Sequence, residues 1–207
     1  MIGIVNYGVG NLSSVANMIR RAGGQAEIVS DADGILRSDK ILLPGVGHFD
    51  HGMRQLNSSG LRDALDEFSL SLRRPVLGIC LGAQILGKGS EEGGESGLGW
   101  IDMRCRRFPE TPGFRVPHMG WASLAIKRES PLLAATEADS RYYFVHSYFM
   151  EVAEQSECVA TAFHGIDFTC VVQRDRIFGT QFHPEKSLRH GLAVIKAFVQ
   201  FEGPPGG

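Results

Sequence analysis

The stretch RPVLGICLGAQ, residues 74–84, constrains the fold more than any other part of the sequence. It begins with a short apolar run of the kind that forms a buried strand, and it ends with residues that open a helix. Cys80 lies where the strand gives way to the helix, and Gly78 and Gly82 flank it two residues to either side. This is the pattern of a nucleophile elbow, a turn too sharp for a Cβ atom beside the nucleophile. The stretch therefore predicts an α/β fold with Cys80 above one edge of the sheet.

A cysteine at this position has a functional and a structural interpretation. In the functional one, the free N–H groups at the start of the following helix favour the thiolate. The same groups, that of Leu81 first, can hold a developing oxyanion. In the structural one, Cys80 is a small buried hydrophobe, as a cysteine between apolar residues usually is. The other candidate residues of the chain decide between the two.

Length and charge narrow the class of protein. The chain of 207 residues is long enough for one large domain, which we expect to span residues 1–202 and to be followed by a disordered tail at residues 203–207. The net charge is −2, and acidic and basic residues are mixed along the whole length. This argues against a surface for nucleic acid or for a membrane.

The four cysteines stand far apart, with no CxxC or other metal-ligand spacing. This is typical of a reduced protein, and it predicts no metal site. Met1 leads directly into a strand-like run, and the sequence has neither a secretory signal nor an apolar run of membrane length. We therefore expect a cytoplasmic location.

The first half of the chain alternates strands and helices. Apolar residues recur at helical spacing from Leu12 to Ala22, and two glycines then stop the helix. Three short segments read as strands: residues 2–6, 26–29 and 40–43. This order predicts a mostly parallel sheet with helices on both faces, whose reactive loops gather at the carboxyl ends of the strands. The glycines in residues 6–12 indicate a tight turn, with a nucleotide-phosphate loop as the alternative.

Two further loops are expected near Cys80. Residues 44–47, PGVG, can turn a backbone N–H toward the nucleophile and complete an oxyanion hole with Leu81, although a plain turn is the alternative. Residues 89–97 read as an exposed, acidic and flexible loop. Such a loop usually only contacts solvent, but a carboxylate in it can receive a substrate ammonium group. An amphipathic helix is predicted at residues 61–72.

The second half of the chain has short alternating segments, typical of antiparallel strands that extend the sheet or form a small second one. These segments are residues 121–126, 141–149, 158–163, 168–172 and 177–182. Residues 116–121 read as a loop with His118, Met119 and Trp121 exposed, a mixture used at interface hot spots, although core packing can also absorb it. His146 reads as a hydrogen-bonded strand histidine.

The motif GTQFHPEKS, residues 179–187, precedes a closing apolar helix. Pro184 favours an extended His183, and in an extended chain residues two apart point to the same side. His183 and Glu185 on a strand can then converge with Cys80 on its elbow. Together they form a nucleophile, a base and an orienting carboxylate.

These motifs resemble those of the class I, or triad, glutamine amidotransferases. GICLGAQ and FHPE are similar to the family as a whole, and PGVG, PHMGW, YFVHSY and HPEKS together resemble its glutaminase subunits of imidazole glycerol phosphate synthase. The resemblance runs from Asn6 to the last helix. It implies a flavodoxin-like core with a β-rich second half, and hydrolysis of L-glutamine to glutamate and ammonia without a metal or organic cofactor.

The resemblance also implies roles for individual residues. Cys80 attacks the side-chain amide, His183 moves the protons, and Glu185 fixes the imidazole ring. The oxyanion is held by backbone N–H groups of Leu81 and of Val46 or Gly47. The substrate contacts are Gly82, Gln84, Glu92, Ser147 and Tyr148.

Subunits of this kind dock onto a (β/α)8 cyclase and pass ammonia through its barrel. The resemblance therefore implies a heterodimer that makes imidazole glycerol phosphate and an aminoimidazole carboxamide ribotide in histidine biosynthesis. The docking face that it implies is formed by Pro117, His118, Met119, Trp121 and Lys186.

Several positions depart from the family's pattern: Ala83 stands where Met is common, Ala122 stands where Asn is usual, and His48 and Gly87-Lys88 are also atypical. None removes a member of the triad, but they leave open a paralogous subunit that supplies ammonia for amidination of a bacterial surface-polysaccharide sugar. Two other classes are a catalytically idle interaction protein and a cysteine hydrolase of peptides or esters. The complete triad opposes the first, and Gln84 with the docking motifs opposes the second.

Overall fold

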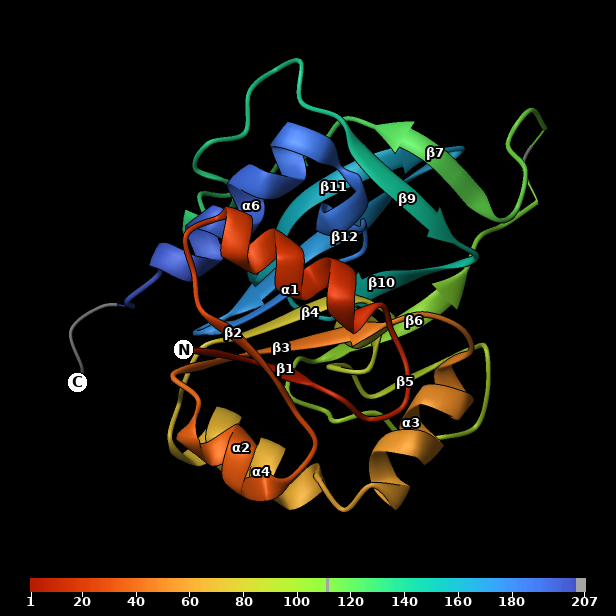
Figure 1. The fold of residues 1–207 in the computed structure, drawn as a ribbon. Coiled ribbons are helices and arrows are strands. Elements are labelled where there is room, and N and C mark those ends of the chain that lie inside the picture. Colours follow the sequence, from red (N-terminus) through yellow and green to blue (C-terminus); the bar gives the residue numbers. More distant parts are fainter. Residues whose placement is uncertain (111, 204–207) are drawn as a thin grey trace.

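The computed structural model of this chain describes residues 1–110 and 112–203. Among them, parallel strands in the order β2-β1-β3-β4-β13 form one half of the main sheet (Figure 1). Their bounds are β1 Ile2–Val5, β2 Ala26–Val29, β3 Lys40–Gly45, β4 Val76–Cys80 and β13 Ile177–Thr180. This strand order is that of flavodoxin-like sheets, and the predicted mostly parallel α/β core is confirmed.

Helices cover both faces of the parallel half (Figure 1). α1, Leu12–Arg21, and α6, Leu188–Gln200, lie on one face, where they contact each other. The opposite face carries α2 Ala32–Arg37, α3 Phe49–Ser58 and α4 Arg62–Asp66. The predicted helix at residues 61–72 is α only in its first part, because α4 continues as a π-helical turn at Glu67–Ser71.

Beyond β13 the sheet continues with the antiparallel strands β12, β10 and β6, and β7 and β9 form a separate two-stranded sheet. Both predicted arrangements of the second half therefore occur. The bounds of its strands are β5 Gly89–Ser90, β6 Met103–Arg107, β7 His118–Ala122, β8 Ala125–Ile126, β9 Tyr142–His146, β10 Tyr148–Val152, β11 Cys158–His164 and β12 Ile166–Arg174. Three-residue 3-10 helices lie at Pro131–Leu133, Gln155–Glu157 and Pro184–Lys186.

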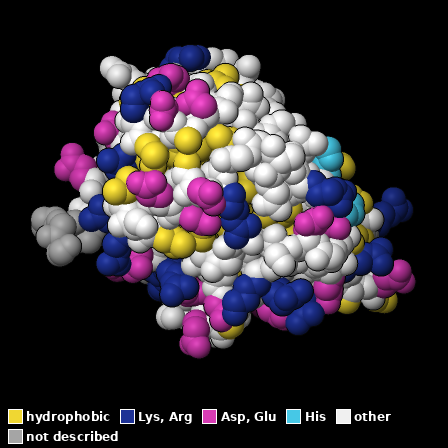
Figure 2. Space-filling view, turned by 90° about the horizontal axis from the view of Figure 1, so that it is seen from below, with side chains coloured by type: hydrophobic (Ala, Val, Ile, Leu, Met, Phe, Trp, Pro, Cys, Tyr) yellow, Lys and Arg dark blue, Asp and Glu magenta, His cyan; other side chains and the backbone are white. Residues whose placement is uncertain are grey.

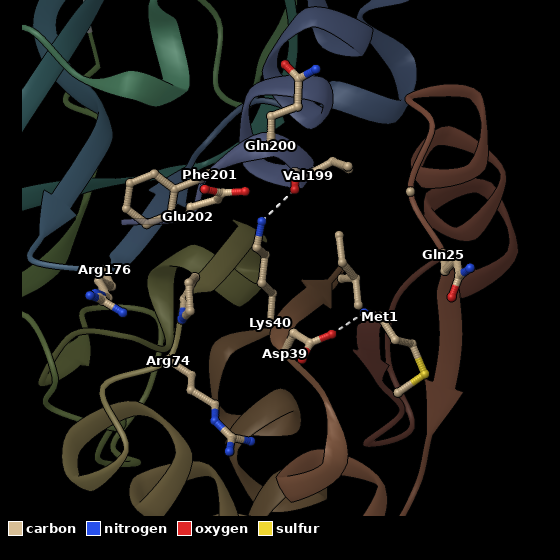
Figure 3. Close-up of a pocket in the computed structure, with 13 residues that line it drawn as sticks. Met1, Gln25, Asp39, Lys40, Arg74, Arg176, Val199, Gln200, Phe201 and Glu202 are labelled. Atoms are coloured by element: carbon tan, nitrogen blue, oxygen red, sulfur yellow. Dashed lines mark hydrogen bonds and ion pairs between the residues drawn. The ribbon is translucent and has the colours of Figure 1, made fainter. Parts of the chain in front are cut away.

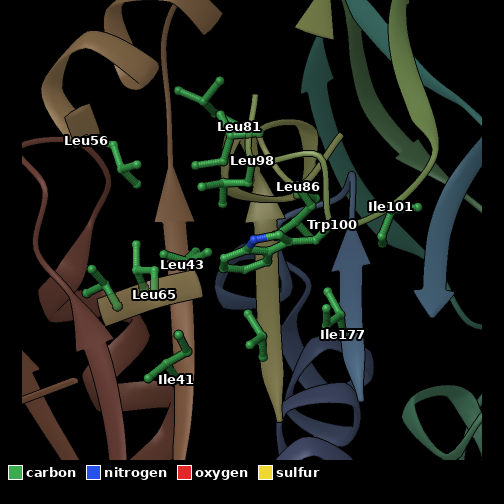
Figure 4. Packing of buried hydrophobic residues seen from close by; sticks show 14 of the residues in the cluster. Ile41, Leu43, Leu56, Leu65, Leu81, Leu86, Leu98, Trp100, Ile101 and Ile177 are labelled. Carbon is green, nitrogen blue, oxygen red and sulfur yellow. The ribbon is translucent and has the colours of Figure 1, made fainter. Parts of the chain in front are cut away.

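Two hydrophobic clusters hold the sheet between the helical layers. The first joins α3 and α4 to the sheet, with Leu43, Leu56, Leu65 and Trp100 among its members (Figure 4). The second joins α1 and α6 to the aromatic side chains of the second half. A fully buried large apolar side chain contributes ~1.5–3 kcal/mol to the free energy of folding. The two clusters therefore hold the sheet rigid, including the carboxyl ends of its parallel strands, where the loops around Cys80 begin.

Some elements differ from the predictions. β13 pairs antiparallel with β12 but parallel with β4, so it belongs to the parallel half rather than to the antiparallel strands. α2 and β6 were not predicted. α2 has only 6 residues, too few for apolar periodicity, and its signal is the N-cap Asp31, whose side chain accepts a hydrogen bond from Gly34. β6 alternates buried and exposed residues, which is a strand signal.

The segment at residues 89–97 was expected to be an exposed, acidic and flexible loop, and the structure differs from this in part. Its first two residues are the buried strand β5, which pairs with β6. Residues 91, 93, 94 and 96 are exposed as expected, and hydrogen bonds to the start of α3 hold this part of the segment. The polar composition of the segment does not reveal these hydrogen bonds. The disordered tail was predicted at residues 203–207, of which residues 204–207 lie outside the described part of the chain.

Candidate active site

Cys80 lies on a sharp turn from β4 into the short helix α5, Leu81–Gln84. Its backbone has φ +53° and ψ −111°, a conformation that L-residues rarely adopt. The flanking glycines allow this turn. A Cβ atom at Gly82 would lie 1.8 Å from the Leu43 carbonyl oxygen, and one at Gly78 would lie 2.5 Å from the Gly82 carbonyl oxygen. The glycine spacing seen in the sequence is therefore a packing requirement of the elbow.

His183 reaches the same edge because β13 lies beside β4 and ends at Thr180. The His183 N–H donates to the Tyr143 carbonyl oxygen at 2.9 Å, which ties the segment to β9. The ring Nδ1 lies 2.7 Å from Oε1 of Glu185, and both side chains are buried. Glu185 was expected on a strand, but it lies in a 3-10 helix. The two residues meet because the chain turns immediately after His183.

The electrostatics of His183 follow from this geometry. Burial alone lowers its pKa, but the Cys80 thiol and the Glu185 carboxylate raise the pKa to about 9. The Nε2 atom is buried and has no conventional hydrogen-bond partner among the described residues. An imidazolium is thus stabilised between a carboxylate and a sulfur atom. This arrangement suits a thiolate nucleophile paired with a proton donor.

The PGVG loop continues β3 toward Cys80. Gly45 is paired with Cys80 across β3 and β4, and Val46 and Gly47 follow it. Gly47 has φ +98°, which favours glycine. Val46, Gly47, Cys80 and Leu81 line one cavity of about 450 Å³. The predicted oxyanion residues therefore share a cavity with the predicted nucleophile.

Tyr7 supports this loop and was not identified from the sequence. Its hydroxyl donates to the Pro44 carbonyl oxygen at 2.7 Å, and its side chain is buried. Burial, together with the nearby Cys80, raises the pKa of Tyr7, so the hydroxyl stays a donor. The motif of residues 6–12 thus forms a turn beneath the PGVG loop. A Cβ atom at Gly10 would lie 3.0 Å from the Pro44 Cβ, so this turn packs closely against the loop.

Gln84 lies at the floor of the cavity. Its Nε2 donates to the Tyr148 carbonyl oxygen and to Gln181 Oε1, each at 3.0 Å. This uses both amide hydrogens and leaves the Gln84 oxygen as an acceptor. Gln181 Nε2 also lies 3.8 Å from Cys80 Sγ. Gln181 was not predicted, because only the pairing of β13 with β4 brings it to the nucleophile.

The opposite wall of the cavity contains His146, Ser147 and Tyr148. His146 Nδ1 lies 2.7 Å from the Tyr148 carbonyl oxygen, an acceptor, so this nitrogen carries the proton. Nε2 of His146 is then an acceptor for Nδ1–H of His118, at 3.3 Å. His118 in turn stacks on His164, with ring centroids 4.2 Å apart. The predicted hydrogen bonding of His146 is confirmed.

His118 and His146 are kept neutral by burial. Burial lowers the pKa of His118 to about 4 and that of His146 to about 3. The expectation of an exposed His118 is wrong, because it is 5% exposed and lies within β7 rather than in a loop. Its neighbours on β7, Met119 and Trp121, are exposed by 63% and 49%. Because side chains alternate along a strand, His118 points inward while Met119 and Trp121 are exposed, whereas the sequence pattern indicated one exposed loop.

The remaining residues predicted to contact the substrate or the partner differ in whether they line the cavity. Glu92, Pro117 and Lys186 line the cavity with Cys80 and His183. Gly82 does not line it and packs against β3 instead. The Lys186 ammonium lies 5.6 Å from the centroid of the Tyr143 ring.

A second cavity of about 520 Å³ lies at the amino ends of the parallel strands and is lined by Met1, Lys40 and Arg74 (Figure 3). Lys40 Nζ donates to the Phe198 and Val199 carbonyl oxygens in the last turn of α6, and Arg74 donates to the carbonyl oxygens of Leu36 and Ser38 at the end of α2. These cations therefore cap helices. On the face seen in Figure 2, cationic and anionic side chains are intermixed.

Within residues 1–110 and 112–203, no group of three or more His, Cys, Asp or Glu side chains could hold a metal ion. Over the same residues, every helix is too short or too polar to cross a membrane.

The sequence matches a known protein family and several of its members. The family profile Glutamine amidotransferase class-I matches residues 4–200. Imidazole glycerol phosphate synthase subunit HisH 2 of Pseudomonas aeruginosa is 46% identical over 200 residues, which cover 97% of this chain and 99% of that protein. Imidazole glycerol phosphate synthase subunit HisH of Leptospira interrogans is 45% identical over 202 residues, 96% of this chain and 99% of that protein.

Solved structures share the fold at low identity. A crystal structure of a glutamine amidotransferase has a TM-score of 0.73 at 18% identity, and the match covers 95% of this chain and 96% of that one. The glutaminase domain of Trypanosoma brucei CTPS with bound acivicin has a TM-score of 0.65 at 15% identity, over 95% of this chain and 90% of that one. These likenesses concern the fold alone.

Proposed function

The chain belongs to the class-I glutamine amidotransferase family, and on this premise we propose that it is the glutaminase subunit of an imidazole glycerol phosphate synthase, which hydrolyses L-glutamine and supplies ammonia in histidine biosynthesis. One observation carries the proposal: His183, which is hydrogen-bonded to the buried Glu185 side chain, lines the same cavity as Cys80 on its strained turn. A nucleophile, a base and an orienting carboxylate in this arrangement perform acyl transfer.

The reaction begins with attack of the Cys80 thiolate on the side-chain amide carbon of glutamine. The developing oxyanion is held by the N–H of Leu81 and by an N–H at Val46 or Gly47. His183, oriented by Glu185, gives its proton to the departing ammonia. Water, deprotonated by His183, then attacks the glutamyl thioester, which releases glutamate and restores the Cys80 thiolate beside the protonated His183.

Recognition of glutamine uses the other residues that line the cavity. Gln84 presents its amide oxygen, and the Ser147–Tyr148 backbone meets the α-carboxylate of the substrate. Glu92 receives the α-ammonium group. Gly82 takes part through the shape of the elbow rather than by contact, since it is packed against β3.

The partner in this proposal is a (β/α)8 cyclase subunit that forms a heterodimer with this chain. Met119 and Trp121 are exposed apolar side chains on β7. The Tyr143 ring lies 5.8 Å from the Trp121 ring and 5.6 Å from the ammonium of Lys186, which lines the cavity with Pro117. Ammonia released there enters the cyclase without passing through water. His118 contributes from beneath the strand. We further propose a single domain over residues 1–202 and a cytoplasmic location.

The test mixes the purified chain with a histidine-pathway cyclase subunit, its ribulosyl-formimino ribotide substrate and glutamine. We expect glutamate and imidazole glycerol phosphate to form in equal amounts, and the free chain to release far less glutamate. Absence of glutamate release by the complex would contradict the glutaminase assignment. Glutamate without the imidazole product would contradict the histidine pathway and indicate the surface-sugar subunit instead.

A further inference from the structure

Asp50, the second residue of α3, joins this helix to the acidic segment that contains Glu92. Its carboxylate accepts the Gly94 N–H on Oδ2 and the Glu95 N–H on Oδ1, both at 3.0 Å. The side chain is 17% exposed. Because each oxygen accepts one backbone amide, the carboxylate fixes the segment in two places. These bonds lower the pKa of Asp50, so it is ionised at neutral pH.

Glu92 completes the connection from the opposite side. Its Oε2 accepts the Phe49 N–H at 2.8 Å, and Phe49 lies two residues after Gly47. The second oxygen of Glu92 is then available to a ligand in the cavity that Glu92 lines. We call the contacts of Phe49 and Asp50 with residues 92–95 the α3 clasp.

Gly93 lies in the middle of the α3 clasp, against the Asp50 carboxylate. A Cβ atom at Gly93 would lie 2.1 Å from Asp50 Cγ, so no larger residue fits while Asp50 keeps its place. Arg54 adds ion pairs to Asp50 and Glu95 at 3.8 and 3.7 Å, but its side chain is mostly exposed. Such exposed pairs contribute little. The hydrogen bonds of Asp50 to the two amides are therefore the main restraint on the segment.

We propose that Asp50 is a positioning residue for substrate selection: through the α3 clasp it holds the Glu92 carboxylate at the cavity, so that the site favours amides that carry an α-ammonium group. This inference rests on the proposed glutaminase function. A carboxylate that is already fixed loses little conformational entropy when it binds an ammonium group. Without the α3 clasp, the Glu92 side chain is mobile and must lose conformational entropy when the ammonium group binds. The affinity for the ammonium group therefore falls.

The experiment compares glutamine with 4-carbamoylbutanoate, which is glutamine without its α-amino group, as substrates of the complex with the cyclase subunit. In Asp50→Ala we expect the KM for glutamine to rise about tenfold and kcat to change less than about twofold. The kcat/KM for 4-carbamoylbutanoate stays the same, because this compound does not use Glu92. Glu92→Gln should lower the preference for glutamine by roughly 10- to 100-fold, as expected for loss of a charged hydrogen bond.

Two double variants test whether Asp50 acts through Glu92. Asp50→Ala in the Glu92→Gln background should cause no further loss of preference. Gly93→Ala should reproduce the effect of Asp50→Ala, because its methyl group displaces the carboxylate. In the Asp50→Ala background, the same Gly93 substitution should have no further effect.

The matched control is Asp63→Ala, which removes an exposed acidic residue from the first turn of α4 and should leave both substrates unaffected. Equal losses for both substrates in Asp50→Ala, or additive losses with Glu92→Gln, would overturn the inference while the proposed function stands. A wild-type complex that releases no glutamate from glutamine would instead overturn the proposed function, and the inference with it.

Discussion

The two walls of the cavity around Cys80 are built in different ways. The wall from the parallel half is backbone packed on backbone: a Cβ atom at Gly45 would lie 2.6 Å from the Gly82 nitrogen. The wall from the antiparallel half is held by side chains, because His146 bonds to the Tyr148 carbonyl oxygen and, behind it, to His118, with both rings neutral. The first wall depends on the absence of side chains, and the second on the protonation state of its side chains.

Removal of the nucleophile should have the largest effect on activity. In Cys80→Ala we expect glutamine hydrolysis by the complex to fall by at least about 10⁴-fold, as for loss of other catalytic nucleophiles. Because the backbone shapes this wall, the free energy of unfolding and that of binding to the proposed cyclase subunit should both stay within about 0.5 kcal/mol of the wild type. Steady-state kinetics and calorimetry provide the measurements. Loss of the complex in this variant would show that the sulfur atom also shapes the wall.

Gly82→Ala tests the backbone packing of the first wall directly. Its methyl group would lie 1.8 Å from the Leu43 carbonyl oxygen, so β3 and α5 must separate. We expect a loss of more than about 4 kcal/mol in the free energy of unfolding, measured with urea. Gly94→Ala is the control, because a Cβ atom there meets nothing within 4 Å. Equal stability of the two variants would contradict the packing argument.

Acid should destabilise the second wall selectively. The folded pKa values of His118 and His146, about 4 and about 3, lie below the usual value of 6.5. The unfolded chain therefore binds more protons, and the stabilisation present above pH 6.5 is lost as the pH falls through the folded values. Between pH 7 and pH 5, each histidine should lower the free energy of unfolding by about 2 kcal/mol.

The variant His118→Phe keeps an aromatic ring in the stack but cannot take up a proton. We compare the free energies of unfolding in urea at pH 7 and at pH 5. The decrease from pH 7 to pH 5 should be about 2 kcal/mol smaller in this variant than in the wild type. The exposed His51, replaced by Asn, serves as the control and should leave the pH dependence unchanged. An unaltered pH dependence in His118→Phe would mean that this imidazole is not kept neutral by the fold.

The smallest expected effect concerns the support beneath the first wall. Tyr7→Phe leaves the buried Pro44 carbonyl oxygen without its donor, which should lower stability by about 1 kcal/mol and kcat by roughly tenfold. Tyr142→Phe is the matched control, because this buried hydroxyl has a partner of its own, Thr136 Oγ1 at 2.8 Å, away from the cavity. It should lose stability but keep its kcat. Equal kcat losses would indicate a general loosening of the fold.

The sequence predicted the first wall far better than the second. The elbow at Cys80 was predictable because its two glycines are local in sequence and are required by the turn. The residues missed, Tyr7, Gln181 and Asp50, act on partners that lie 37, 101 and 44 positions away. No periodicity or spacing marks such pairs, because the sheet order alone creates them. For the same reason the parallel pairing of β13 with β4 was missed.

The prediction for the second wall was wrong at residues 116–121, where the sequence carries signals for both a loop and a strand. The segment around His118 contains Pro117 and Gly120, which indicate a loop, yet the chain forms a strand with alternating buried and exposed residues. His183 and Glu185 met as predicted, although through a 3-10 turn rather than along a strand. Chemical complementarity between these side chains was thus a better guide than the expected backbone conformation.

All four thiols of the chain are free and buried, yet only the Cys80 residue lines one of the cavities described for residues 1–110 and 112–203. Burial raises the pKa of Cys105 and of Cys170, which keeps both in the unreactive thiol form. An electrophilic glutamine analogue should therefore modify one sulfur per chain. The mass gained by a preparation would then measure the fraction of its molecules that have a reactive Cys80.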